Sequence, residues 1–241
     1  MTDNPHRIKL WDLPIRLFHW LLAALVLAAV ITGKVGGSAI VWHGRIGLAI
    51  LGLIAFRIVW GLVGSTHARF ASFFPTPASI AAYLRGQWHG LGHNPLGALS
   101  VLGLLTLLTA QVSTGLFAND DIAFRGPLSD LISKDNSDAL STYHRLIIKG
   151  LLAMILLHLG AIAFYTHVKK DSLVKPMISG WKDIDPNHAT PFSPLHYRGG
   201  GPIALICALA FASFAVYAGS GAWLPPPPVA QPAATQKTPA W

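Results

Sequence analysis

The chain has 241 residues, of which 52% are hydrophobic and only 12% are charged. A soluble globular domain carries about twice that share of charged residues, so the composition excludes an ordinary soluble fold and favours lipid as the solvent. The formal net charge of +8 lies mainly in loops predicted to share one side of a membrane, and we do not interpret it as nucleic-acid binding.

Five apolar runs, each long enough to cross a bilayer, follow one another along the chain. They cover residues 15–32, 46–63, 96–117, 147–165 and 203–223. The first run could be a secretory signal, but it is long for one and no A-x-A cleavage site follows closely. We therefore predict an all-α integral membrane helix bundle, with a four-helix core and a fifth, C-terminal transmembrane helix.

Lys and Arg are concentrated before the first run and in the connections that follow the second and fourth runs. The positive-inside rule then predicts a multi-pass protein with a cytoplasmic N-terminus. With five spans the C-terminus lies outside, where residues 225–241 form a proline-rich tail of disordered composition. The single cysteine, Cys207, cannot form an intrachain disulfide, and we expect it to be a small buried apolar residue.

Four of the eleven histidines lie in or at the edges of the predicted spans. His19 lies in the first span, His43 enters the second, His144 enters the fourth, and His158 lies within the fourth. Ionisable groups at such depths are costly in lipid and are candidates for a functional site.

The spacing of these histidines predicts that they meet in pairs. His144 and His158 are fourteen residues apart, which places them on one helix face within about 40° and about 21 Å apart along the axis. Given the direction of each span, His19 lies at the level of His158, and His43 at the level of His144. The sequence therefore predicts two bis-imidazole sites at two depths.

Two opposed imidazoles inside a helix bundle are suited to hold the iron of a flat cofactor, and two non-covalent haem b groups fit best. Zinc would need three or four converging ligands. For any single histidine, a hydrogen bond to a carbonyl of a neighbouring helix is an equally good explanation, but four matched in depth argue against it. Arg57 follows His43 by fourteen residues and would face a haem propionate or snorkel to the cytoplasmic interface.

A family resemblance rests on ordered motifs: "KLWDLPIRLFHW", "WHGRIGLAILGLIAFRIVWGLVGSTHARF", "GHNPLGALSVLGLLTLLTAQVSTGLF" and "YHRLIIKGLLAMILLHLGAIAFYTHVKKDSLVKPMISG". These stretches resemble the cytochrome b subunit of nickel-iron hydrogenases and the related bacterial cytochrome b561 proteins. The similarity covers roughly residues 8 to 182. Within "GHNPLG", Asn94 is expected to cap the third span and Pro95 to occupy its first position.

The resemblance implies a di-haem cytochrome b of the bacterial inner membrane, with His19, His43, His144 and His158 as haem ligands. It implies residues 1–182 as the di-haem transmembrane domain, followed by a loop and fifth span over 183–224 and the tail over 225–241. Such proteins pass electrons in a respiratory chain between quinone and a partner, either a c-type cytochrome or a hydrogenase-like subunit. An alternative is a stand-alone superoxide:quinone oxidoreductase, and a homo-oligomer is left open.

Overall fold

The structure is a computed structural model that describes residues 6–88, 90, 92–122, 124–184 and 197–225. Within these residues, five helices are long and apolar enough to cross a membrane: α1 (Leu13–Val35), α2 (Ala39–Val63), α4 (Pro95–Leu116), α5 (Lys134–His167) and α7 (Gly201–Gly219). The shorter elements are β1 (His6–Lys9), η1 (Phe70–Ser72), α3 (Pro77–Leu84), η2 (Ser129–Leu131), α6 (Val174–Ser179) and β2 (Trp181–Ile184). The predicted all-α membrane bundle is confirmed, and a two-stranded ribbon is added to it.

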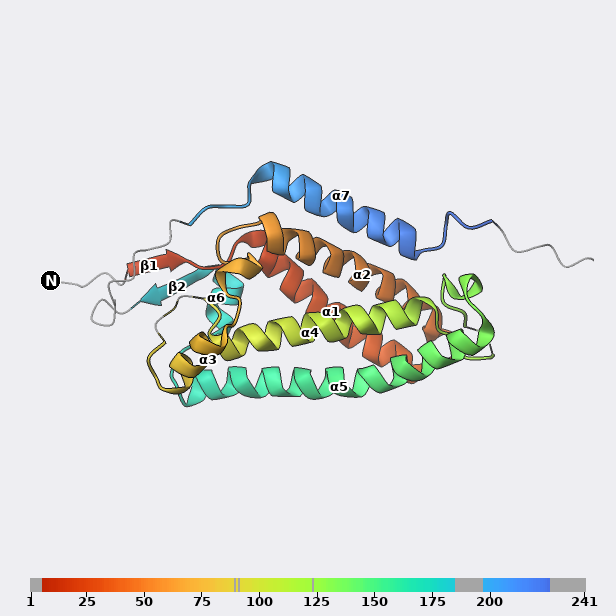
Figure 1. The fold of residues 1–241 in the computed structure, drawn as a ribbon, viewed down its shortest axis with the longest axis horizontal. Helices are drawn as coiled ribbons and strands as arrows, with labels where there is room; N and C mark the ends of the chain where they lie inside the picture. The colour runs from red at the N-terminus through yellow and green to blue at the C-terminus, as the bar shows by residue number, and fades with distance from the viewer. Residues whose placement is uncertain (1–5, 89, 91, 123, 185–196, 226–241) are drawn as a thin grey trace, which may run out of the picture.

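Four of the long helices form the core, and α7 packs outside it, on the far side of α2 from α5 (Figure 1). Close packing joins α1 to α2, α2 to α4, α4 to α5, and α2 to α7. The backbone of α5 approaches α1 and α2 much less closely than it approaches α4. Apolar side chains fill the middle of the bundle, among them Ile50, Leu108 and the 2%-exposed Leu151.

One end of the bundle, called the strand end below, carries β1, β2, α3 and α6 (Figure 1). The strand His6–Lys9 pairs antiparallel with Trp181–Ile184. Next to this ribbon, the backbone amides of Leu10 and Trp11 both donate hydrogen bonds to the carbonyl of Gly180. The opposite end, called the loop end, consists of the α1–α2 turn and residues 117–122 and 124–133. The ribbon thus ties the start of α1 to the segment that follows α5.

Side-chain caps fix where two of the spanning helices begin. Asn94 Oδ1 accepts a hydrogen bond from the amide of Gly97 at 2.7 Å, and Pro95 opens α4, as the sequence predicted. Asp12 plays the same part for α1, where its Oδ1 accepts from the amide of Ile15 at 2.8 Å. Each cap satisfies an amide that has no partner inside its own helix.

Two helices begin well before the apolar runs that predicted them. α2 starts at Ala39 rather than residue 46, and α5 starts at Lys134 rather than residue 147. The opening of α5 is polar, so a search for apolar residues passes over it, whereas Ser133 caps it by accepting a hydrogen bond from the amide of Asn136. His43 and His144 therefore lie inside helices and not at their entrances.

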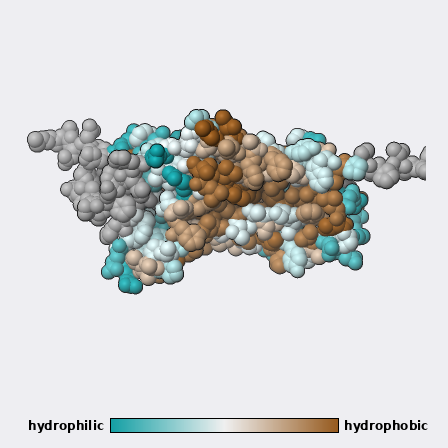
Figure 2. Space-filling view, turned by 45° about the horizontal axis from the view of Figure 1, so that its top comes forward, coloured by the Kyte–Doolittle hydropathy of each residue, from teal (hydrophilic) through white to brown (hydrophobic). Residues whose placement is uncertain are grey.

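The surface of the bundle has the pattern of a membrane protein. Figure 2 shows a hydrophobic band across the visible face, with hydrophilic residues towards both ends. Large apolar side chains such as Leu157 and Phe214 are more than half exposed, at 65% and 63%, which is favourable only against lipid. Cys207 is also exposed, so the expectation of a buried cysteine is wrong; the face of α7 that packs on α2 carries Ala204 and Ala208 instead.

The predicted proline-rich tail, apart from Pro225, lies outside the described residues, as does most of the loop before α7.

Candidate haem sites

The structure brings His19 of α1 and His158 of α5 together at the strand end. Their ring centroids are 6.5 Å apart and their planes are inclined by 50°. Both imidazoles are half-buried. This is the pairing that the spacing of the histidines predicted.

A second pair, His43 of α2 and His144 of α5, lies at the loop end. The ring centroids are 6.0 Å apart and the planes are nearly perpendicular, at 88°. Leu151 lies on α5 midway in sequence between His144 and His158 and belongs to the apolar cluster in the middle of the bundle. The two pairs are thus separate sites with packed side chains between them.

Both separations fit an iron held from two sides. Two imidazoles on opposite faces of one iron, each bonded at about 2 Å, have ring centroids about 6 Å apart. The backbone of α5 lies farther from α1 and α2 than from α4, and the two histidine pairs lie between α5 and these two helices. The residues present therefore fit haem iron, which a pair of histidines would hold at each end.

Hydrogen bonds at the loop end fix which nitrogen of each imidazole carries the proton. His43 Nδ1 lies 2.9 Å from the carbonyl oxygen of Ala29, and His144 Nδ1 lies 2.9 Å from that of Gln111. Since a carbonyl can only accept, each Nδ1 carries the proton and each Nε2 keeps its lone pair. Such a bond also fixes the orientation of a ligating imidazole.

Gln111 makes a second contact with His144. Its side-chain amide lies 3.0 Å from His144 Nε2 and donates to that lone pair, while its own Oε1 is buried without a partner. The amide therefore competes with a metal for the same nitrogen. Sequence reasoning missed Gln111, because an amide among apolar residues carries no distinctive spacing.

Two glycines let the helices close around the loop-end imidazoles. A Cβ built on Gly33 would lie 3.0 Å from the ring of His43, and one on Gly115 would lie 3.0 Å from the ring of His144. Any side chain there would push the ring away. Gly33 follows His19 by fourteen residues, the same interval that relates the histidines of α5, so its spacing could have revealed it.

Arg57 lies at the strand end and is buried, with 3% of its surface exposed. Its guanidinium stacks over the ring of Phe70, 4.5 Å from the centroid, and its Nη1 has no hydrogen-bond partner. Burial of this kind does not fit an arginine that snorkels to the interface. An unsatisfied buried guanidinium nitrogen fits an anionic group, such as a haem propionate.

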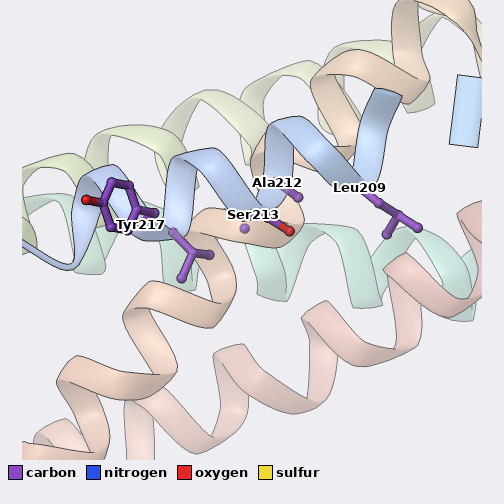
Figure 3. Close-up of a pocket in the computed structure, with 6 residues that line it drawn as sticks. Leu209, Ala212, Ser213 and Tyr217 are labelled. Atoms are coloured by element: carbon purple, nitrogen blue, oxygen red, sulfur yellow. The ribbon is translucent and has the colours of Figure 1, made fainter. Parts of the chain in front are cut away.

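A groove of about 400 Å³ lies between α2 and α7, away from these pairs (Figure 3). No histidine lines it, and we assign no haem site there. Its lining residues are Gly52, Leu209, Ala212, Ser213, Val216 and Tyr217.

Comparison with known proteins identifies the family of the chain. The family model described as prokaryotic cytochrome b561 matches residues 10–180. A relative from Azotobacter chroococcum mcd 1, named "Probable Ni/Fe-hydrogenase B-type cytochrome subunit", is 24% identical over 213 residues, covering 73% of this chain and 88% of the relative. The Rhodobacter capsulatus protein of that name is 25% identical, covering 72% and 80%.

An Escherichia coli (strain K12) protein named as the B-type cytochrome subunit of Ni/Fe-hydrogenase 1 is 20% identical over 220 residues, covering 75% of this chain and 93% of the relative. A search of solved structures finds no significant match. The family match covers α1 to α6 and leaves α7 outside. The chain belongs to the prokaryotic cytochrome b561 family and is a multi-pass membrane cytochrome that carries b-type haem and transfers electrons across the membrane.

Proposed function

We propose that the chain binds two haems b, one between His19 and His158 and one between His43 and His144. Electrons would then pass between a redox partner and the quinone pool of a bacterial respiratory chain. The observation that carries this proposal is the presence of two imidazole pairs, each about 6 Å apart, at opposite ends of one bundle.

Each part of the bundle has a role in this proposal. Haem iron, when bound, supplies a one-electron Fe(III)/Fe(II) couple. The four histidines hold the two iron atoms at two depths, since fourteen residues of α5 span about 21 Å. The apolar cluster between them keeps water out of the middle of the bundle. Arg57 binds a propionate at the strand end.

The distribution of charge supports a cytoplasmic strand end and an N-terminus inside. The elements gathered there carry Arg7, Lys9, Arg16, Arg69, Arg85, Lys169, Lys170, Lys175, Lys182 and Arg198. The strand end also carries Asp12, Asp171 and Asp183, whereas the loop end has fewer cations and more carboxylates, namely Asp120, Asp121, Asp130, Asp135 and Asp138. By the positive-inside rule the loop end then faces the outer side of the bacterial inner membrane.

For the partner we propose a hydrogenase-like subunit, with a c-type cytochrome as the second choice. The relatives carry the names of Ni/Fe-hydrogenase cytochrome subunits. These names do not favour the alternative of a stand-alone superoxide:quinone oxidoreductase. Copurification from native membranes tests the partner, and quinone reduction by superoxide without any partner would support the alternative.

Counting haems tests the central proposal. Pyridine haemochrome assays and reduced-minus-oxidised spectra of the purified protein should give two low-spin b haems per chain. One haem, or none, would overturn it. His158→Ala should remove one haem and His43→Ala the other, whereas His167→Ala, an exposed position at the end of α5, should keep both.

A further inference from the structure

His93 is a half-buried histidine that none of the roles above uses. It lies in the short segment before α4, at the strand end, outside the spanning helices. Its ring sits between two aromatic rings, with centroids 4.7 Å from Trp11 and 4.8 Å from Phe73. Its Nδ1 is buried and has no hydrogen-bond partner.

Arg57 and His93 therefore present two unsatisfied nitrogens in one region. Phe70, which stacks on Arg57, also packs against Phe73, which in turn packs against His93. Burial first and the charge of Arg57 second lower the pKa of His93 to about 3, and the charges of His158 and His19 act in the same direction. His93 is thus a neutral imidazole that lies within electrostatic range of Arg57 and of the strand-end histidine pair.

The nearest buried carboxylate is already engaged. Asp12 Oδ1 accepts from the amide of Ile15, and Asp12 Oδ2 accepts from Trp60 Nε1 at 3.0 Å. No ion pair is formed by Arg57 within 4.0 Å among the described residues. A buried donor without an acceptor is costly. Two unsatisfied nitrogens in one region, one of them on a charged guanidinium, indicate that an anion from outside the chain binds there.

We infer that His93 and Arg57 together bind one carboxylate of the cofactor held between His19 and His158. The guanidinium supplies the positive charge and one N–H group, and the imidazole supplies a neutral N–H group held in place by Trp11 and Phe73. This inference rests on the proposed function, because it needs a haem at the strand end. It assigns His93 a binding role for which its position outside the spans gave no indication.

Removing the donor at position 93 should weaken the strand-end site and leave the loop-end site alone. Loss of an outer contact of this kind lowers the affinity for a metal group by about tenfold or more. A carboxylate that loses a hydrogen-bond donor keeps more of its negative charge. That charge stabilises Fe(III) relative to Fe(II). A tenfold change in that preference lowers a one-electron potential by about 59 mV.

The test is a spectroelectrochemical titration of the purified holoprotein and of three variants. His93→Phe keeps an aromatic ring between Trp11 and Phe73 but removes the donor. His93→Asn returns an N–H group close to the position of Nδ1. His167→Phe is the matched control on an exposed histidine. The strand-end wave is the one that is absent in His158→Ala. We expect the midpoint potential of this wave alone to fall in His93→Phe and to recover in His93→Asn.

Reconstitution with haem dimethyl ester, which has no free carboxylate, supplies a second readout. With the ester, wild-type protein and His93→Phe should have the same potentials and haem affinities. A shift that persists with the ester would overturn the inference and assign the donors to water. So would equal shifts of both waves, or none, in His93→Phe. A wild-type protein with fewer than two haems would instead overturn the proposed function.

Discussion

Asp12 ties the start of α1 to α2, and its replacement should weaken both the fold and the strand-end site. It is 5% exposed, and its two oxygens accept hydrogen bonds from the amide of Ile15 at 2.8 Å and from Trp60 Nε1 at 3.0 Å. His19 lies seven residues further along α1, which is about two helical turns. A loosened first turn would therefore act directly on the position of a proposed ligand.

The magnitude can be estimated from these two bonds. Asp12→Ala loses a helix cap of about 1 kcal/mol and a hydrogen bond to a charged acceptor of about 1.5–3 kcal/mol. Together they amount to about 3 kcal/mol, which lowers Tm by about 6–12 °C in a chain of this length. Asp12→Asn keeps an oxygen for the cap, but its NH₂ group cannot accept from Trp60. We expect Asp12→Asn to lower the free energy of unfolding by about half as much as Asp12→Ala.

Thermal unfolding in detergent, followed by circular dichroism and haem absorbance, measures both variants. Asp130→Ala is the control, because this carboxylate pairs with Arg125 at the exposed surface, where such a pair contributes little. If Asp12→Asn proved as destabilising as Asp12→Ala, the two bonds would not act separately. If both variants had the same Tm as the wild-type protein, Asp12 would not stabilise the contact between α1 and α2.

Three further changes test the surroundings of the sites. Gly33→Ala places a methyl 3.0 Å from the His43 ring, so the loop-end haem should be lost in preference to the other, as haem per chain will measure. Gln111→Leu removes the amide that donates to His144 Nε2; haem added to the apoprotein should bind faster, and slower binding would contradict this. Burial lowers the pKa of His93 to about 3 from 6.5. In the haem-free protein the unfolded chain therefore binds the extra proton, and the free energy of unfolding should fall as pH falls from about 6.5 towards 3. His93→Phe should flatten that slope in denaturant titrations.

The features that follow from regular helix geometry were largely predicted from the sequence. Apolar runs located all five spans because a helix in lipid must present hydrocarbon on nearly every side. The interval of fourteen residues paired the histidines because the α-helix returns to nearly the same face after that interval. The Asn94 cap followed from a short polar side chain before a proline.

Features that depend on non-local contacts were not predicted. The ribbon joins His6–Lys9 to Trp181–Ile184, which lie near opposite ends of the di-haem domain in sequence, and no local pattern indicates such a partner. The burial of Arg57 depends on η1 folding back so that Phe70 covers the guanidinium. Each of these required the tertiary structure.

The two histidine pairs differ in a way that should separate their redox potentials. At the loop end, both Nδ1 atoms donate to backbone carbonyls, of Ala29 and Gln111, which makes an imidazole a more basic ligand and favours Fe(III). At the strand end, Nδ1 of His19 has no partner and Arg57 adds a buried positive charge, which favours Fe(II). We therefore expect the loop-end wave at the lower potential, with the waves assigned in single-haem variants. Electrons entering at the loop end would then move downhill to the strand end. A strand-end wave at or below the loop-end wave would contradict this reasoning, because the hydrogen bonds and charge described here would not control the iron.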